Sequence, residues 1–415
     1  MSRTAPPRPT SGLIAAVLEG KFEPLARPRL RDGNRLRLFA SAGPYFEALL
    51  EAVARARHSV NLETYIFADD RIGGRVIDAL VAAAARGVQV RVLIDGYGGG
   101  DFAQRLVRRL APRGVAVRIY RPAHWWRPRR HMFRRLHRKI AVIDDRIAFV
   151  GGINVNDDPE RDEHDGDRIG PRLDIAVQCE GPIVAAVAHA VHRLWWSIGV
   201  ANLRELSGPP PHRPRPSPPE PDGVRAAFLL RDSLRNRHTI ERSYLAAIRS
   251  ARHEILLANA YFLPGRRFRR ALVRAAHRGV RVRLLLQGRI EYLIQHYAQR
   301  ALYGQLLDAG IEIFEYRDSY LHAKVAVVDD DWATVGSSNI DPLSLLLARE
   351  ANVLVRDRAF SEALRNLLET AIQTGSHQLH ALLFSKRSWG ERVLDWITYG
   401  IVRIATILLA RGNNY

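Results

Sequence analysis

The chain has 415 residues, of which 47% are hydrophobic and 26% charged; it is long enough for two domains, and this composition excludes a disordered protein. Its formal net charge of +20, carried mostly by arginine, favours an anionic partner such as nucleic acid or the surface of an anionic bilayer. The single cysteine, Cys179, excludes an internal disulfide and a cysteine-built zinc site, and it favours a reducing compartment.

The start of the chain bears on membrane topology. Residues 1–30 begin with a proline- and arginine-rich stretch, and we expect a poorly ordered or loosely docked tail. The apolar run from Leu13 to Leu18 is too short for the hydrophobic region of a signal peptide or for a membrane span. We therefore do not expect the chain to cross a membrane at its start.

From about Leu36, helical and strand patterns alternate. Apolar residues recur at helical spacing in some segments and form continuous runs in others. Gly87 suits the position after a helix C-terminus, and residues 96–100 form a glycine-rich turn. The alternation predicts a layered α/β sheet with right-handed crossovers. The predicted helices are 40–56, 74–86 and 102–110, and the predicted strands are 59–67, 88–95 and 115–120.

The second half of the chain repeats the first. Residues 251–255 resemble 56–60, and residues 278–284 resemble 86–92. Residues 310–316 then resemble 114–120 in the same order. A repeat in matching order indicates two homologous α/β halves.

A proline-dense segment, 207–223, separates the halves and lacks any periodicity, which is typical of an exposed linker with polyproline character. We place the domain boundary there. The expected organisation is a tail at 1–30, a first half at 31–206, the linker at 207–223, a second half at 224–385 and a C-terminal segment at 386–415.

Two further segments suit an anionic membrane. Residues 121–138 contain Trp125, Trp126 and several arginines but no acidic residue, which fits a lipid headgroup interface. The same composition also suits stacking on single-stranded nucleic acid, and a solvated basic loop is the plainest alternative. Residues 389–410 predict an amphipathic helix that either lies in the membrane interface or packs on the protein.

One motif occurs twice in the chain. The first copy, H-x-K-x4-D, contains His137, Lys139 and Asp144, and a Gly-Gly-Ile-Asn turn follows. The second copy contains His322, Lys324 and Asp329, and a Gly-Ser-Ser-Asn turn follows. Because the spacing and the downstream turn are both repeated, we predict that the two copies meet in one phosphodiester-handling site.

Strand geometry divides the motif. Residues two apart on a strand share a face, so each histidine projects with its lysine. Asp144 and Asp329 follow their histidines at an odd offset, so parity assigns them to the scaffold. The glycine-rich turns let backbone approach an anion, and they bring Asn154, Ser337 and Asn339 within reach of phosphate oxygens.

Two imidazoles and two ammonium groups suit transfer at a phosphodiester. One neutral histidine attacks phosphorus, the other gives a proton to the leaving alcohol, and the lysines neutralise the non-bridging oxygens. A lysine two residues from each histidine disfavours a divalent cation, so we expect neither a metal nor another cofactor. Asp174 and Glu350 follow the first and second motifs. On sequence alone, each either accepts a hydrogen bond from the histidine in its own half and fixes the tautomer of that ring, or is a surface residue at the start of a strand.

These motifs resemble those of the phospholipase D superfamily, whose signature is the duplicated His-Lys-Asp pattern. Residues 132–139, 258–265 and 332–344 further resemble the B branch of the bacterial cardiolipin synthases. The resemblance implies two α/β/α sandwich halves related by a pseudo-twofold axis, with one active site between them. It implies that all six motif residues, Asp144 and Asp329 included, form the catalytic signature, with His137 as nucleophile and His322 as acid. It also implies that Asp174 and Glu350 orient the histidines.

The resemblance implies a phosphatidyltransferase that converts two phosphatidylglycerol molecules to cardiolipin and glycerol. The expected partners are phospholipid and an anionic membrane surface rather than nucleic acid, at the cytoplasmic face of the cell membrane. A phospholipase D that uses water and yields phosphatidic acid carries the same motifs. A nuclease of the superfamily would also suit the basic charge, and a catalytically inactive binding protein is disfavoured by the intact histidine–lysine pairs.

Overall fold

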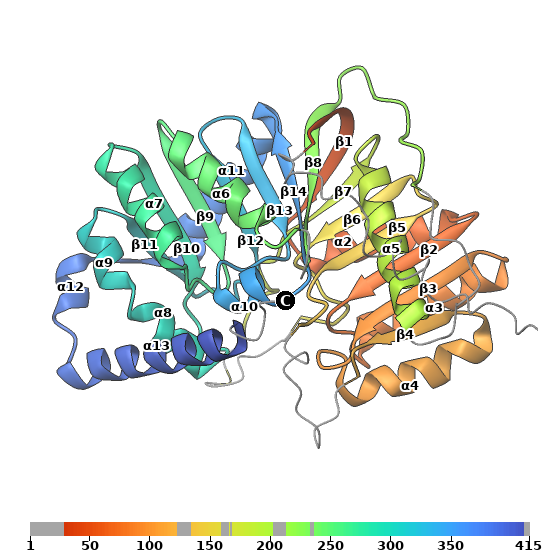
Figure 1. Ribbon diagram of the computed structural model, residues 1–415, viewed down its shortest axis with the longest axis horizontal. Coiled ribbons are helices and arrows are strands. Elements are labelled where there is room, and N and C mark those ends of the chain that lie inside the picture. The colour runs from red at the N-terminus through yellow and green to blue at the C-terminus, as the bar shows by residue number, and fades with distance from the viewer. Residues whose placement is uncertain are drawn as a thin grey trace, which may run out of the picture.

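One mixed β-sheet runs through both halves of the protein (Figure 1). Its strand order is β15-β11-β10-β9-β12-β13-β14-β8-β1-β7-β6-β5-β2-β3-β4. The order on one side of the central β8–β1 pair mirrors the order on the other, as a pseudo-twofold axis requires. The computed structural model describes residues 29–122, 134–158, 166, 168–201, 213–232 and 236–410.

Corresponding strands of the two halves have the same neighbours. β2, β3 and β4 pair in parallel, as do β9, β10 and β11, whereas the strands that carry the motifs pair antiparallel. In the first half the strands are β1 (Arg31–Phe39), β2 (Ser59–Thr64), β3 (Gln89–Asp95), β4 (Ala116–Tyr120), β5 (Lys139–Ile143), β6 (Ile147–Gly151) and β7 (Ala176–Glu180). In the second they are β8 (Val224–Arg231), β9 (Glu254–Asn259), β10 (Arg281–Gln287), β11 (Glu312–Tyr316), β12 (Lys324–Val328), β13 (Trp332–Gly336), β14 (Glu350–Arg356) and β15 (Ser376–Leu379).

Helices cover both faces of the sheet. α2, α3 and α4 pack on one face of the first half, and α6, α7 and α9 pack on one face of the second. α5 and α11 share a single core that spans both halves. The long helices are α2 (Ala42–Arg55), α3 (Arg71–Ala85), α4 (Gly100–Leu110), α5 (Val184–Ala201), α6 (Thr239–Ser250), α7 (Arg266–His277), α11 (Arg358–Gly375) and α13 (Trp389–Ala410). The short ones are the 3-10 turn η1 (Ala111–Arg113), α8 (Leu293–Arg300), α9 (Tyr303–Asp308), α10 (Pro342–Leu346) and α12 (Ala381–Ser385).

The central strands are apolar because both of their faces are covered. In β5, Ile140 and Val142 contribute to the core shared by the two halves, whereas Ala141 and Ile143 contribute to the core beneath α2 and α3. Lys139 has the same parity as Ala141 and Ile143, and it stands at the end of the strand. The chain thereby places a buried lysine at the N-terminal end of a central strand.

The predicted elements exist, with some changes at their ends. β1 begins at Arg31, earlier than the pattern expected from about Leu36, and the strand expected at 59–67 ends at Thr64. Gly87 has a φ of +87°, as the predicted helix end requires. The linker residues 213–223 contain neither helix nor strand. Residues 1–28, 207–212 and the tryptophan pair within 123–133 lie outside the described residues.

The C-terminal segment forms α13, which packs against α8 along the lower edge of the second half (Figure 1). Its exposed large apolar side chains include Trp389, Trp396, Ile397, Ile401 and Ile404, while the charged residues Glu391 and Arg392 are exposed near its start. Among the helices that the structure describes, none has the length and apolar content needed to cross a membrane.

Candidate active site

Each motif histidine lies just before its strand, on a segment that is bonded to the other half. The His137 N–H donates to the Arg349 carbonyl over 3.0 Å, and the His322 N–H donates to the Leu173 carbonyl over 2.9 Å. Arg349 and Leu173 are the residues immediately before the two orienting carboxylates. The backbone therefore places each histidine beside the carboxylate of the opposite half.

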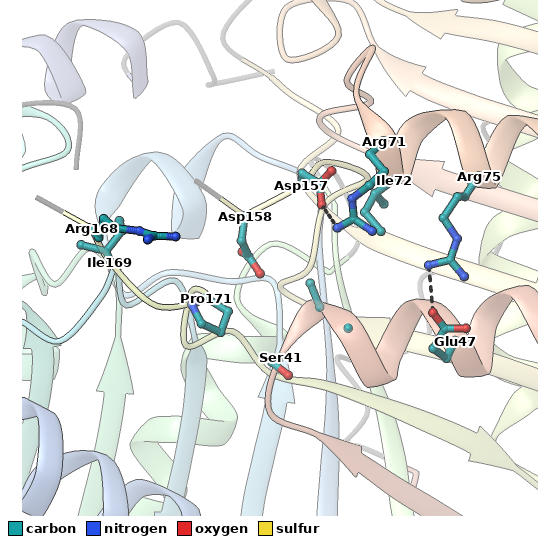
Figure 2. Close-up of a pocket in the computed structure, with 12 residues that line it drawn as sticks. Ser41, Glu47, Arg71, Ile72, Arg75, Asp157, Asp158, Arg168, Ile169 and Pro171 are labelled. Carbon is teal, nitrogen blue, oxygen red and sulfur yellow. Dashed lines mark hydrogen bonds and ion pairs between the residues drawn. The ribbon is translucent and has the colours of Figure 1, made fainter. Parts of the chain in front are cut away.

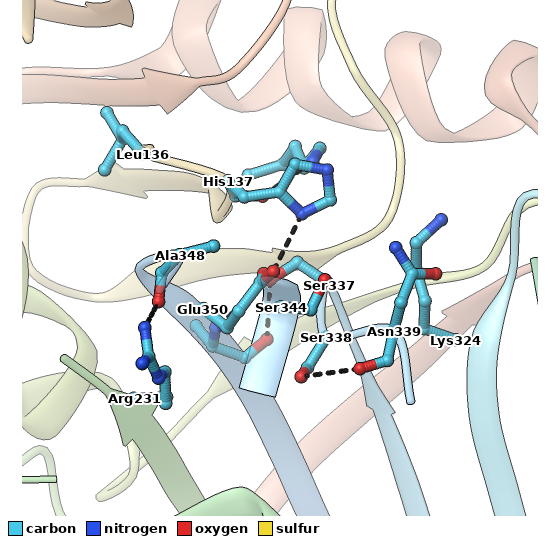
Figure 3. A network of polar contacts seen from close by, with 12 residues as sticks. Leu136, His137, Arg231, Lys324, Ser337, Ser338, Asn339, Ser344, Ala348 and Glu350 are labelled. Carbon is cyan, nitrogen blue, oxygen red and sulfur yellow. Dashed lines mark hydrogen bonds and ion pairs between the residues drawn. The ribbon is translucent and has the colours of Figure 1, made fainter. Parts of the chain in front are cut away.

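The side chains also pair across the two halves, so that each histidine contacts the carboxylate of the opposite half. Nδ1 of His137 lies 2.9 Å from Oε1 of Glu350 (Figure 3), and Nδ1 of His322 lies 2.7 Å from Oδ2 of Asp174. The prediction that each acid supports the histidine of its own half is wrong. The interface bonds at Arg349 and Leu173 decide the pairing, and sequence order does not reveal them.

The two carboxylates are supported differently. The Ser337 hydroxyl donates to Oε2 of Glu350 over 2.5 Å and accepts the Ala351 N–H over 3.1 Å (Figure 3). That hydroxyl was predicted to bind phosphate, and the structure instead assigns it to the carboxylate. At the matching position, Gly152 leaves room for Asp174, because an added Cβ would lie 2.1 Å from Oδ1 of that residue.

Electrostatics sets the protonation states. Burial raises the pKa of both carboxyls, but the contact with the partner histidine and the nearby lysine charge outweigh it, so the pKa of Asp174 and that of Glu350 are lowered. An ionised carboxylate only accepts hydrogen bonds, so Nδ1 of each histidine donates. When the ring is neutral, Nε2 is left with its lone pair. Both imidazoles keep about a sixth of their surface exposed, 17% for His137 and 16% for His322.

The lysines and His322 are tuned towards their neutral forms. Burial lowers the pKa of Lys139 to about 7 and that of Lys324 to about 8. Burial, followed by the charge of Lys324, lowers the pKa of His322 to about 3. Each lysine donates to the carbonyl of its own histidine, over 2.6 Å in the case of Lys139. A site with these shifts is set to receive an anion, which restores the cationic forms.

The motif aspartates lie away from this chemistry. Asp144 accepts the N–H groups of residues 57, 58 and 59, and Asp329 accepts those of residues 252, 253 and 254. Both have positive φ angles, +52° and +48°, in the turn that ends the motif strand. Five residues of strand put them roughly 16 Å from the lysines. The catalytic role implied for Asp144 and Asp329 is therefore replaced by the scaffold role that strand parity predicts.

The turn asparagines are both buried. Oδ1 of Asn154 accepts the Ile66 N–H over 3.2 Å, so its carbonyl is committed to the scaffold. Asn339 follows β13, as Figure 3 shows, and its Oδ1 has no hydrogen-bond partner among the described residues. Of the two side chains, only that of Asn339 has an amide oxygen without a hydrogen-bond partner among the described residues.

Several functional contacts were missed by sequence reasoning. The Tyr65 ring meets the His137 ring edge-on at 5.0 Å, and the Lys139 ammonium lies 5.4 Å from the centre of the same tyrosine. The sequence feature that could have indicated these contacts is the position of Tyr65, an aromatic residue directly after the strand at 59–64. Arg138, which is 1% exposed, forms a buried ion pair with Glu63 and so ties the His137 segment to β2. This pair could not have been found without the tertiary structure, because 75 residues separate its members.

A cavity of about 600 Å³ lies elsewhere, beside α2 and α3 (Figure 2). Two of its arginines are already paired: Arg71 with Asp157 at 2.6 Å, and Arg75 with Glu47 at 2.8 Å. Neither motif histidine lines it. Among the described residues, no group of three or more His, Cys, Asp or Glu side chains is placed to hold a metal ion.

The sequence and the fold of this chain match known proteins. The family model for the cardiolipin synthase, PLD-like domain matches residues 49–165 and 244–372. A solved structure of phosphatidylserine synthase from Haemophilus influenzae superposes with a TM-score of 0.71 at 14% identity, covering 93% of this chain and 97% of that one. At that identity the likeness shows the fold: two phospholipase D-like α/β halves.

The curated relatives are closer in sequence. Cardiolipin synthase B of Salmonella typhimurium is 40% identical over 389 residues, which cover 90% of this chain and 89% of the relative. Cardiolipin synthase B of Escherichia coli K12 is 40% identical over 385 residues, with the same coverage. The chain belongs to the cardiolipin synthases of the phospholipase D superfamily, a family of phosphatidyltransferases, and it is of their B type.

Proposed function

We propose that the protein transfers a phosphatidyl group from one phosphatidylglycerol to another, giving cardiolipin and glycerol. The observation that carries this proposal is the exchange of carboxylates. Each histidine is completed by the opposite half, through Glu350 for His137 and Asp174 for His322, so two imidazoles and two lysines stand in one site. Family membership supplies the phospholipid substrate.

In the first step, Nε2 of neutral His137 attacks the phosphorus of the first phosphatidylglycerol. The bond from phosphorus to the glycerol headgroup breaks, and protonated His322 gives its proton to the departing oxygen. Glu350 stabilises the charge that develops on His137, because it holds the Nδ1–H of that ring. The product of this step is a phosphatidyl-histidine and free glycerol.

The second step reverses the first with a new alcohol. A headgroup hydroxyl of the second phosphatidylglycerol gives its proton to His322 and attacks phosphorus, and the bond from phosphorus to His137 breaks. Because the pKa of free His322 is lowered to about 3, its donor role requires the bound phosphate anion to raise that pKa. Lys139 and Lys324 neutralise the non-bridging oxygens.

We place the enzyme peripherally at the cytoplasmic face of the membrane. The exposed apolar face of α13 supports contact with a bilayer, and so do the exposed residues Tyr292, Leu293 and Ile294 at the start of α8, against which α13 packs. The net charge of +20 supports an anionic surface, and the absence of paired cysteines in the sequence supports a reducing compartment.

The test supplies purified protein with phosphatidylglycerol vesicles in the absence of added metal and of any nucleotide-activated lipid. Cardiolipin and glycerol are expected in equal amounts. Phosphatidic acid as the sole lipid product would instead establish hydrolysis, and cleavage of nucleic acid without lipid turnover would establish a nuclease.

The paired variants His137→Ala and His322→Ala test the shared site. Each is expected to lower kcat by at least about 10⁴-fold, and the double variant to lose no more than either single one, because the residues act as a unit. Near-normal turnover by either single variant would contradict a single site built from both halves.

A further inference from the structure

A second cavity, of about 400 Å³, lies between α9, α12 and α13, away from the reacting histidines. It has a charged interior and an apolar rim. Its lining residues include Arg300, Phe384, Arg387, Arg392, Asp395 and Trp396. Neither of the duplicated motifs contributes to it, and the proposed transfer reaction does not use it.

Two arginines of this cavity lie close to the same aromatic ring, that of Phe384. The Arg387 guanidinium lies 3.5 Å from the centre of the Phe384 ring, and that of Arg300 lies 5.5 Å from the same centre. Arg300 also pairs with Glu315 at 2.9 Å, and Arg387 pairs with Asp395 at 2.8 Å. Arg392 is exposed and forms no ion pair with any residue that the structure describes. Of the three arginines that line the cavity, Arg392 is therefore the one whose guanidinium N–H groups are available to bind a phosphate.

Asp395 adds an acceptor to the cavity. Its side chain is 2% exposed, and while Oδ2 receives Arg387, Oδ1 has no hydrogen-bond partner among the described residues. An unpaired buried acceptor is unfavourable, so a ligand that donates a hydrogen bond to Oδ1 of Asp395 gains affinity. Burial raises the pKa of Asp395, although the hydrogen bond from Arg387 acts in the opposite direction. A hydroxyl group is a donor of the right kind.

The rim is the set of exposed apolar side chains of α12 and α13 that stand close in sequence to lining residues, and of these Trp396 itself lines the cavity. Leu382 and Leu383 on α12 are 78% and 66% exposed, and Trp389 and Trp396 on α13 are 80% and 58% exposed. Tryptophan favours the headgroup level of a bilayer, and leucine favours the acyl region. A cavity that offers arginine and a hydroxyl acceptor beneath such a rim matches a molecule with a phosphate, hydroxyls and hydrocarbon chains.

We propose that this cavity binds the glycerophosphate headgroup of a membrane phospholipid, with the phosphate at Arg392 and a glycerol hydroxyl at Asp395. The bound lipid anchors the N-terminal end of α13 to the bilayer and is not a reactant. Since α13 packs along α8 and contacts α10, which follows the second motif turn, the anchor holds the active site against the membrane. The inference rests on the proposed function only in requiring that the protein meets a phospholipid bilayer.

The experiment compares two charge reversals on the same helix, Arg392→Glu in the cavity and Arg403→Glu outside it. Binding is measured by sedimentation with phosphatidylglycerol vesicles and with phosphatidylcholine vesicles, and melting curves verify folding. Arg392→Glu is expected to weaken binding to the anionic vesicles about tenfold more than Arg403→Glu, because a specific contact is lost in addition to general attraction. Equal losses for the two variants would overturn the proposal.

A soluble headgroup, glycerophosphoglycerol, identifies the ligand. It is expected to compete with anionic vesicles for the wild-type protein and not for Arg392→Glu. Equally effective competition by inorganic phosphate would overturn the contact of a hydroxyl with Asp395. Binding is measured without turnover, so this result is independent of whether cardiolipin is formed. With phosphatidylglycerol in detergent micelles, Arg392→Glu should keep wild-type kcat, since the reaction does not use this residue.

Discussion

The two halves of the protein present the same histidine–lysine pair but surround it differently. Glu350 reaches His137 with a long side chain and is steadied by the Ser337 hydroxyl. Asp174 reaches His322 with a shorter side chain, and Gly152 stands where the serine stands in the other half. The aromatic environment differs as well, because Tyr65 contacts His137 and the matching residue of the second half is an alanine.

This difference shows how a repeated sequence can build an asymmetric site. Both histidines have a carboxylate on Nδ1, so both are oriented with Nε2 towards substrate. The surroundings of the two histidines differ in the residues that support the carboxylates and in the contact with Tyr65. Different surroundings give two chemically identical groups different protonation states, as a nucleophile and a proton donor require. Because each histidine depends on the opposite half, neither half holds a complete site.

The carboxylates provide the strongest test of the exchange. Asp174→Asn and Glu350→Gln are each expected to lower kcat by roughly 10³- to 10⁴-fold, because the amide no longer holds the correct tautomer or stabilises the charged ring. The pairing is read from histidine ring signals in NMR spectra. Glu350→Gln should shift the ring signals of His137 and leave those of His322 in place. The opposite pattern would contradict the exchange.

The residues that hold the two carboxylates in place, Ser337 and Gly152, provide a second test of the difference between the halves. Gly152→Ala is expected to lower kcat about 100-fold, because the new methyl group would displace Asp174, and a shift of about 1 Å has that effect in a catalytic site. Ser337→Ala should lower kcat only about tenfold, since one hydrogen bond to a charged group is lost. Ser338→Ala is the matched control and should behave as wild type. A harmless Gly152→Ala would show that Asp174 has room to move.

The pH dependence of kcat/KM tests the lysines, because this quantity reports the free enzyme. A lysine is cationic below its pKa, and the phosphodiester is anionic throughout this range. Since the pKa of Lys139 is lowered to about 7 and that of Lys324 to about 8, the positive charge is lost as pH rises through these values. We expect kcat/KM to fall about tenfold per unit between pH 7 and pH 8 and about a hundredfold per unit above pH 8, where both lysines lose their charge. A flat profile up to pH 10 would mean that both lysines remain protonated.

The motif aspartates are expected to have the smallest effect on chemistry. Asp144→Ala and Asp329→Ala should each lower the free energy of unfolding by about 2 kcal/mol, because three backbone N–H groups lose a charged acceptor. Turnover below the melting transition should stay within about threefold of wild type. Asp144→Asn is the control, since asparagine tolerates the positive φ and keeps one acceptor oxygen. Loss of turnover without loss of stability would show that Asp144 and Asp329 take part in the reaction.

The repeat, the α/β class and the two strands that carry the motifs could all be predicted from the amino-acid sequence. These follow from local patterns: apolar runs of strand length, glycine after helices, and parity along a strand. Parity also separated Asp144 and Asp329 from the reacting groups, which the bonds of both aspartates to backbone N–H groups bear out. A rule that depends on neighbours a few residues apart can be read without the fold.

Which carboxylate serves which histidine could not be predicted without the fold, because Glu350 lies 213 residues after His137 and Asp174 lies 148 residues before His322. The interface pairs the backbone of Leu136 with Arg349 and that of Leu173 with Leu321, and these contacts set the exchange. The same holds for the Ser337 hydroxyl and for the lowered pKa values, which come from burial and from charges brought together by folding. Local sequence carries the groups, and long-range packing assigns their partners.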